Sequence, residues 1–240
     1  MTKKYSRDKT IYELAEELYP IKLYKARCIN WKGKATDRDE LYSEIIAETL
    51  MENCEKLKTI PSITREKTYF GQNHGNVKTS GSNRKEENFA KEIYKRKREL
   101  GTLGLIKDYQ IPLKDNLGNE GIGKIDLISY NEKDKILFLI ELKHPPNTDT
   151  LLRAVLEIYT YYKIVDRKKL IKDFREFSGC VDPDNEITII PAVLLVPECN
   201  AYKELKEIND KRPSLEKLSR KLGVRFFTIE TSDLVNEIKL

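Results

Sequence analysis

Cysteine is scarce in this chain of 240 residues, and its four cysteines are widely spaced: Cys28, Cys54, Cys180 and Cys199. Because no two of them form a Cys-x-x-Cys pair, the sequence supports neither a zinc ribbon nor a redox motif, and we expect free thiols. Long apolar runs are missing too. The longest, such as 136–140 and 192–196, are far shorter than the roughly 20 residues that cross a membrane. No segment is expected to span a bilayer.

Motifs that bind nucleotide phosphates are also missing. The sequence contains neither Gly-x-x-x-x-Gly-Lys-Ser/Thr nor Gly-x-Gly-x-x-Gly, which argues against an ATPase or a dehydrogenase. Three glycines fall within 118–123, but they join two expected strands and indicate only a turn. The first ten residues, MTKKYSRDKT, have no apolar segment behind their charges, and we therefore expect a cytoplasmic protein.

Charge is what the chain has in quantity. Charged residues make up 35% and hydrophobic residues 39% of it, which still leaves enough apolar side chains for a core in one or two domains. The net charge is +5, from 44 basic and 39 acidic residues. Basic residues gather in 64–85 and 91–98, which favours a polyanionic partner, although a solvated helix face explains the second segment equally well.

Residues 1–61 are expected to form a helical region. Apolar residues recur at helical spacing in two groups, the first being Ile11, Leu14, Ala15 and Leu18 and the second Leu41, Ile45, Ile46 and Leu50. Asp37 is placed to cap the second helix, with Glu40 completing a capping box, and Trp31 is expected to pack between the helices. Residues 62–83 are rich in Gly, Asn, Ser, Thr and Lys and predict a long loop.

Residues 84–240 show a regular order of helices and strands, which we expect to form a second domain. The pattern predicts strands at 109–114, 122–130, 135–143, 186–197 and 224–229. It predicts helices at 84–100, at 149–166 with further helix to about 177, at 202–222, and a short helix at the end of the chain. Near-continuous apolar runs such as 136–140 are typical of strands buried on both faces. The fold class is therefore α/β, with a central mixed sheet of about five strands flanked by helices.

Three ionisable residues interrupt the expected hairpin of the second and third strands. Asp126 lies within the second strand, and Glu141 and Lys143 end the third. Residues two apart in a strand share a face, so Glu141 and Lys143 project the same way. If Tyr130 pairs with Lys135, Asp126 lies opposite Leu139 on that face, and the two carboxylates are diagonal neighbours about 5 to 8 Å apart. Such oxygen ligands suit Mg²⁺ or Mn²⁺. A buried ion-pair cluster is the alternative.

With a helix expected before the sheet and another after the hairpin, an acid in one strand and Glu-x-Lys at the end of the next form a pattern that resembles the PD-(D/E)XK nuclease superfamily. The resemblance implies a restriction-endonuclease-like αβββαβ core. The resemblance covers about 83–166. It implies that Asp126, Glu141 and the backbone carbonyl of Leu142 bind the metal and that Lys143 positions the water. Ile125 stands where the family name has proline, and Glu157 stands where many members carry glutamine in the following helix.

The resemblance also implies a catalytic glutamate in the helix before the sheet, for which Glu86 and Glu87 are candidates. Glu86 falls near the centre of the apolar stripe of this helix, whereas Glu87 lies about 100° away, so we choose Glu86. An acid that complements the helix dipole is the alternative reading of Glu86.

These residues predict a metal-dependent nuclease that hydrolyses phosphodiester bonds in DNA, with RNA not excluded. A nucleic-acid-binding module that does not cleave and a structural protein with a salt-bridge network are the rivals. Neither the oligomeric state nor endo versus exo cleavage follows from the sequence, and a homodimer is left open. Five basic residues near the expected site are candidates for nucleic-acid contacts: Lys78, Arg84, Lys85, Lys91 and Lys95.

Overall fold

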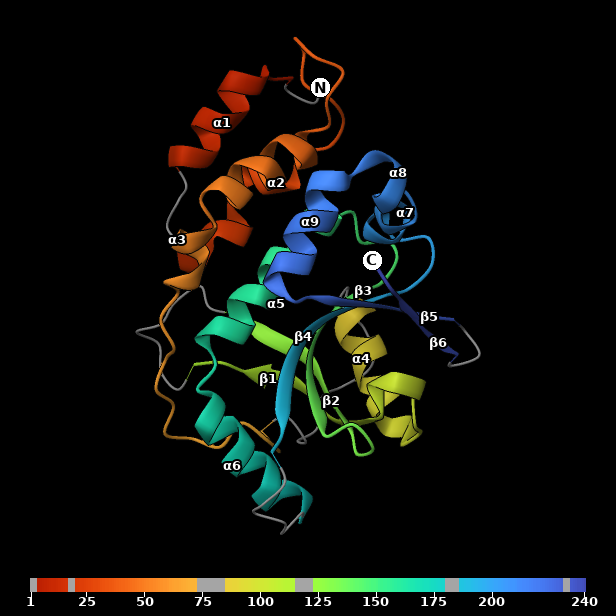
Figure 1. Ribbon diagram of the computed structural model, residues 1–240. Coiled ribbons are helices and arrows are strands. Elements are labelled where there is room, and N and C mark those ends of the chain that lie inside the picture. Colours follow the sequence, from red (N-terminus) through yellow and green to blue (C-terminus); the bar gives the residue numbers. More distant parts are fainter. Residues whose placement is uncertain (1–3, 17–19, 73–84, 115–122, 180–185, 231–233) are drawn as a thin grey trace.

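A six-stranded mixed β-sheet forms the centre of the computed structural model (Figure 1). The structure describes residues 4–16, 20–72, 85–114, 123–179, 186–230 and 234–240. In the sheet the strands follow one another in chain order: β1 Leu105–Pro112, β2 Lys124–Asn131, β3 Ile136–Lys143, β4 Thr188–Leu195, β5 Arg225–Ile229 and β6 Val235–Ile238.

The strand directions make the sheet mixed, as the sequence predicts. Strands β1, β2 and β3 form an antiparallel meander, β4 and β5 run parallel to β3, and β6 is antiparallel to β5. The expected short helix at the end of the chain is wrong. Val235 pairs there with Ile229 and Ile238 with Phe226, so the backbone of this segment is satisfied by an edge-strand ladder.

Helices surround this sheet and account for most of the rest of the described chain. Their bounds are α1 Arg7–Glu16, α2 Tyr42–Glu52, α3 Cys54–Lys58, α4 Lys85–Arg96, α5 Leu151–Ile164, α6 Arg167–Ser178, α7 Asn200–Lys206, α8 Ile208–Lys211 and α9 Pro213–Leu222, with 3₁₀ turns η1 Pro20–Lys25, η2 Arg27–Asn30 and η3 Gly101–Leu103. The continuous helix expected over 202–222 is three helices, and the last begins at Pro213, which lacks the N–H that would continue a preceding helix.

Strand β3 is buried on both faces, which confirms the expectation from its apolar run. Leu137 and Leu139 belong to the core cluster that includes α5 and α9, whereas Phe138 and Ile140 belong to the cluster that includes α4. These helices lie on opposite sides of the sheet in Figure 1. Side chains of Asp126, Glu141 and Lys143 therefore approach α5 if they follow the alternation of Leu137 and Leu139.

The N-terminal helical region packs directly on the rest of the chain. Leu23, Ile46 and Leu50 lie in the same core cluster as Leu215 and Leu218 of α9. In addition, the Glu44 carboxylate accepts hydrogen bonds from the backbone N–H groups of Ser214 and Leu215 at 2.7 and 3.1 Å, so a residue of α2 caps the start of α9. Within the described ranges, no helix combines the length and apolar character of a membrane span.

The expected cap on the second helix is wrong. Helix α2 begins after Leu41 without a side-chain cap, and Asp37 Oδ1 instead accepts from the backbone N–H of Arg7 at 2.9 Å, at the start of α1. Glu40 pairs with the Arg7 guanidinium at 2.6 Å. Asp37 thus satisfies a backbone N–H at the start of α1, and Glu40 pairs with the charge of Arg7. Trp31 does pack as expected, stacked on Tyr5 with 4.1 Å between ring centroids.

Candidate active site

The register of the β2–β3 hairpin decides how the predicted site residues meet. Leu127 pairs with Ile140 and Asn131 with Ile136, so the expected pairing of Tyr130 with Lys135 is wrong by two residues. The paired residues of the hairpin end at Leu127 and Ile140, and extending this register by one residue sets Asp126 opposite Glu141. A shift of two keeps each side chain on its face, and the two carboxylates therefore still share one face of the sheet.

Asp126 is held by two donors from the neighbouring strands. Its Oδ2 accepts from the backbone N–H of Leu142 at 2.9 Å, and its Oδ1 accepts from Gln110 Nε2 at 2.8 Å. Gln110 has a φ of 50°, which is uncommon for a residue with a side chain and is found preferentially at functional sites. The carboxylate of Asp126 is thus oriented by β1 and β3 together.

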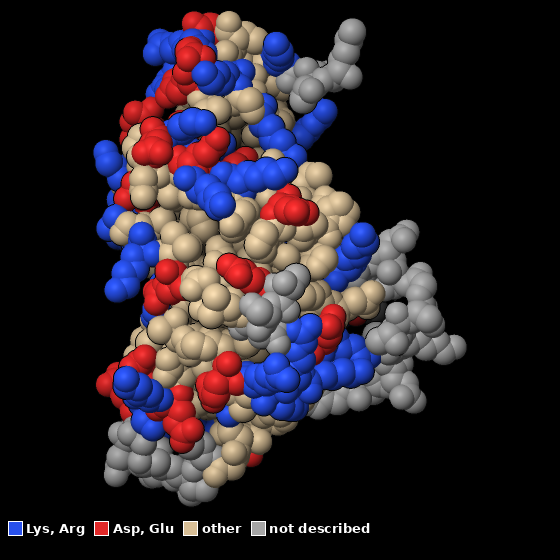
Figure 2. All heavy atoms as spheres, turned by 90° about the vertical axis from the view of Figure 1, so that its right-hand side faces the viewer, with Lys and Arg blue, Asp and Glu red and all other residues tan. Residues whose placement is uncertain are grey.

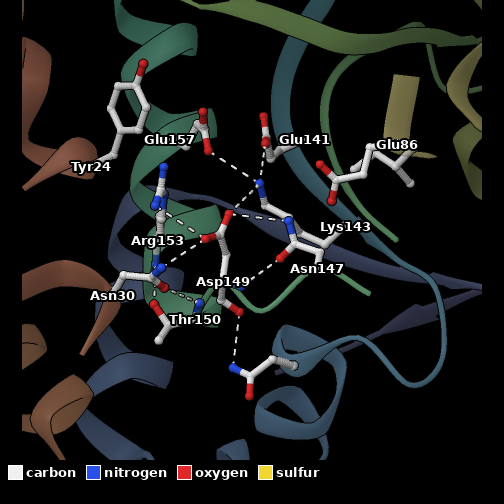
Figure 3. Close-up of polar contacts among 12 residues, drawn as sticks. Tyr24, Asn30, Glu86, Glu141, Lys143, Asn147, Asp149, Thr150, Arg153 and Glu157 are labelled. Atoms are coloured by element: carbon white, nitrogen blue, oxygen red, sulfur yellow. Dashed lines mark hydrogen bonds and ion pairs between the residues drawn. The ribbon is translucent and has the colours of Figure 1, made fainter. Parts of the chain in front are cut away.

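Lys143 lies at the centre of three carboxylates (Figure 3). Its Nζ is 2.7 Å from Glu141 Oε1, 3.4 Å from Asp149 Oδ2 and 3.4 Å from Glu157 Oε2. The ammonium group has three N–H donors, so three acceptors match its capacity. Lys143 and Glu141 are 3% and 4% exposed, which makes this a buried ion-pair cluster as well as a candidate site.

Glu157 and Asp149 connect the cluster to the N-terminal region. Tyr161 donates to Glu157 Oε1 at 2.9 Å, and the hydroxyl of Tyr161 is 3.2 Å from that of Tyr24 in η1. Asp149 precedes α5, and its Oδ1 accepts from Asn30 Nδ2 of η2 at 3.0 Å and lies 3.3 Å from Arg153 Nη1. The helix that carries Glu157 therefore contributes an acid to the site where the resemblance leads one to expect glutamine.

Glu86 of α4 lies where the site borders a cavity. Its Oε1 accepts from the backbone N–H of His144 at 3.1 Å. A cavity of about 500 Å³ lies beside this contact, and it is lined by Lys85, Glu86, Glu87, Gln110, Asp126, His144, Pro146, Asn147, Thr148 and Asp149. Both helical candidates border the cavity, but it is the Glu86 carboxylate that is tied to the residue following Lys143.

Burial and like charges raise the pKa of several acids at the site. Desolvation raises the pKa of Asp126 to about 7, and it also raises the pKa of Glu86. The pKa of Glu141 lies well above its ordinary value because of burial and the charges of Asp126 and Glu157. Bringing a cation into the site would stabilise these acids in their ionised form.

Neighbouring charges shift the pKa of Lys143 and the pKa of Asp149 in the direction that favours the ionised form. Burial alone would lower the pKa of Lys143, but the carboxylates of Glu141 and Glu157 raise it well above its ordinary value, so the ammonium form is favoured. Burial would raise the pKa of Asp149, but the positive charges of Lys143 and Arg153 lower it. Asp149 is therefore an ionised carboxylate at the wall of the cavity.

The donor set fits a hard divalent cation held by few protein ligands. Among the residues that the structure describes, no three His, Cys, Asp or Glu side chains are spaced as a metal-binding cluster. Mg²⁺ commonly binds through only one or two carboxylates, with water and substrate phosphate completing its shell. Asp126 and Glu141 supply two such carboxylates on one face of the hairpin, and burial is the main cause of the raised pKa of each.

The predicted nucleic-acid contacts are placed unequally. Lys85 and Lys95 are exposed on α4, and Lys85 also borders the cavity. Lys91 is only 9% exposed and offers little of its side chain to a phosphate. Lys78 and Arg84 lie outside the described residues. Figure 2 views the side of the molecule that carries α4 and shows Lys and Arg side chains over most of this face, interspersed with Asp and Glu, with one contiguous basic group in its lower half.

No family model matches the chain, and no curated protein or solved structure matches it either.

Sequence reasoning missed three residues that the structure brings to the site: Asn30, Gln110 and Asp149. Asp149 could have been found, because an acid just before the helix that follows Glu-x-Lys is close in sequence to Lys143. Gln110 and Asn30 carried no such signal. Gln110 reaches Asp126 by strand pairing, and Asn30 reaches Asp149 across 119 residues of chain.

Proposed function

We propose that this protein is a metal-dependent nuclease that hydrolyses phosphodiester bonds in DNA. The observation that carries the proposal is the meeting of Asp126, Glu141 and Lys143 on one face of the β2–β3 hairpin, beside an acid-lined cavity. Burying this many charges has a free-energy penalty that a purely structural hairpin would avoid with apolar residues. Sites of this composition hold a cation and act on a substrate that brings its own negative charge.

The order of elements supports the same proposal. The order α4, β1, β2, β3, α5, α6, β4 corresponds to the αβββαβ order of the restriction-endonuclease-like core if α6 is taken as an addition, with an antiparallel meander and a parallel fourth strand. In that arrangement the acids of β2 and β3 and the acid of α4 approach the same end of the sheet. Element order alone does not establish an activity, so the proposal rests on the residues of the site.

Each residue of the site has a role in the proposed reaction. Asp126 and Glu141, with the carbonyl of Leu142, would hold Mg²⁺ or Mn²⁺, which supplies Lewis acidity at the phosphate and an activated water. Lys143 stays protonated, so it acts as a hydrogen-bond donor that orients the water and not as the base that deprotonates it. Glu86, at the mouth of the site, borders the cavity where the substrate phosphate would lie.

A basic surface beside the cavity supports nucleic acid as the substrate. Lys85 and Lys95 are exposed on α4, and Lys85 borders the cavity. Such a surface attracts the phosphate backbone and positions it without reading sequence. Phosphate contacts of this kind suit DNA and RNA alike, and the test below therefore compares the two.

A nucleic-acid-binding module that does not cleave is the second candidate. One observation favours it: Lys143 is ion-paired with three carboxylates of the chain and donates hydrogen bonds to two of them, so most of its donor capacity is used within the protein. The two candidates make different predictions for metal dependence, because a module that only binds has no use for a cation at Asp126 and Glu141.

The test is incubation of the purified protein with single- and double-stranded DNA and RNA, with Mn²⁺ and with EDTA. Cleavage that requires Mn²⁺ and is lost in Asp126→Asn supports the nuclease. The matched control is Glu132→Gln, an exposed acid in the turn of the same hairpin, which should cleave at the wild-type rate. Binding without cleavage, and no calorimetric signal for Mn²⁺ or Mg²⁺, would support the non-catalytic module instead.

A further inference from the structure

The three carboxylates around Lys143 are not equivalent. Asp149 lines the cavity, whereas Glu141 and Glu157 are not among its lining residues. The contact at 3.4 Å with Asp149 Oδ2 therefore draws the ammonium group toward the cavity. The contacts with Glu141 at 2.7 Å and Glu157 at 3.4 Å hold it in the buried part of the cluster.

Asn30 of η2 orients Asp149 with both ends of its amide, together with Arg153, 3.3 Å from the same carboxylate oxygen, and Asn147, which donates to the other oxygen at 3.4 Å. Asn30 Nδ2 donates to Asp149 Oδ1 at 3.0 Å, and Asn30 Oδ1 accepts from the backbone N–H of Thr150 at 2.8 Å. One carboxylate oxygen is thereby occupied, which turns the other, Oδ2, toward Lys143 (Figure 3). An amide with a donor and an acceptor can satisfy both groups at once, and no single charged side chain can.

We propose that Asp149 and Asn30 are positioning residues, which hold the Lys143 ammonium on the cavity side of its cluster. On this view the N-terminal region is part of the active site. The inference rests on the proposed nuclease function and deepens it, because it assigns to Asp149 the placement of the residue that orients water.

The decisive variant is Asn30→Asp. It keeps an acceptor for the Thr150 N–H but sets a second carboxylate against Asp149 Oδ1, so Asp149 turns away from its present place. We expect kcat for Mn²⁺-dependent cleavage of an oligonucleotide to fall by about tenfold to 100-fold, with KM changed less than about twofold, because orientation of the water and not substrate binding is affected. A wild-type kcat would overturn the proposal.

Thr150→Val is the matched control at the same junction. Thr150 Oγ1 donates to the carbonyl of Ile29 at 2.8 Å and accepts from the backbone N–H of Arg153 at 3.2 Å, so valine removes one of the bonds between η2 and α5 and the helix cap. We expect lower thermal stability with kcat within about twofold of the wild-type value. A loss of kcat equal to that of Asn30→Asp would mean that loosening this junction is enough, and would overturn the proposal.

Exchanging the two side chains separates a positioning role from a structural one. In the double variant Asn30→Asp/Asp149→Asn, an amide again faces a carboxylate, so we expect the melting temperature to recover relative to Asn30→Asp. Activity should stay low, because residue 149 no longer carries the charge that draws Lys143 to the cavity. Recovery of kcat together with stability would show that only packing was affected.

A structural readout makes the outcome independent of cleavage. In crystals of Asn30→Asp we expect Lys143 Nζ to keep its contacts with Glu141 and Glu157 and to move beyond 4 Å from Asp149, whereas Thr150→Val should keep all three contacts. If the wild-type protein cleaves no nucleic acid, the nuclease proposal fails while this measurement still stands. If Lys143 stays in contact with Asp149 in Asn30→Asp, the inference itself fails.

Discussion

Lys143 is the residue whose loss should disturb the molecule most. It is 3% exposed and balances three carboxylates, so Lys143→Ala leaves buried negative charge without its cation. We expect the free energy of unfolding at pH 8 to fall by about 3–5 kcal/mol and cleavage to be lost. Urea unfolding at pH 8 and pH 5 measures this, and the destabilisation should be smaller at pH 5, where the carboxylates can bind protons. Equal losses at both pH values would contradict the assigned ion pairs.

Asp126 should show the opposite pH dependence from a paired surface acid. Its folded-state pKa is raised from 3.8 to about 7, so between about pH 4 and pH 7 the unfolded chain releases this proton before the folded one does. Stability from this group is therefore present at low pH and lost as pH rises, by about 1.4 kcal/mol for each pH unit in that range. In buffer with EDTA, the wild type should become progressively less stable than Asp126→Asn across this range. A difference that is constant with pH would contradict this assignment.

At the scale of elements, the start of α5 should depend on a residue of α7. Glu204 Oε2 accepts from the backbone N–H of Leu151 at 2.8 Å, and Glu204 is 7% exposed. In Glu204→Ala this buried N–H loses its partner, and Arg212, 3.8 Å from Glu204, loses a counter-charge. We expect a loss of about 2–3 kcal/mol in the free energy of unfolding, measured with urea.

The control for this element is Glu207→Ala. Glu207 also lies near Arg212, at 3.7 Å, but 40% of its side chain is exposed, so its removal should change stability by less than about 0.5 kcal/mol. Equal effects of the two substitutions would mean that Arg212 pairing, and not the cap on α5, stabilises this part of the fold.

At the scale of the whole molecule, the distribution of basic charge should set the salt dependence of DNA binding. Each phosphate neutralised adds about 0.9 to the slope of log affinity against log salt on duplex DNA. We therefore expect the triple variant Lys78→Ala, Arg84→Ala, Lys85→Ala to bind more weakly and to flatten the slope by roughly two to three units. Fluorescence anisotropy between low and physiological salt measures the slope.

A triple variant in the N-terminal region serves as the matched control, because it removes the same net charge elsewhere. Lys22, Arg27 and Lys32 are exposed and lie in or next to η1 and η2. Their replacement by alanine should leave the slope within about one unit of the wild type. If the slope changes there and not in the first triple variant, DNA follows the N-terminal region instead of α4.

Local sequence patterns were enough to predict five of the six strands and the side on which the hairpin acids lie. Alternation along a strand has a period of two residues, so Asp126, Glu141 and Lys143 share a face whether the register is the expected one or the one observed, two residues away. Apolar runs likewise indicated that β3 is buried on both sides. Such features depend on neighbours in the chain, and local spacing is enough to predict them.

The partners that surround those residues come from distant segments of the chain and follow from the tertiary structure. Asn30 meets Asp149, Gln110 meets Asp126 and Glu204 caps α5 through contacts between segments that are 16 to 119 residues apart. The final segment became strand β6 because β5 offered an open edge, and Asp37 accepts from a backbone N–H at the start of α1, 30 residues away. These partners depend on long-range packing, and the periodicity of a single segment does not predict which distant segment will complete its hydrogen bonds.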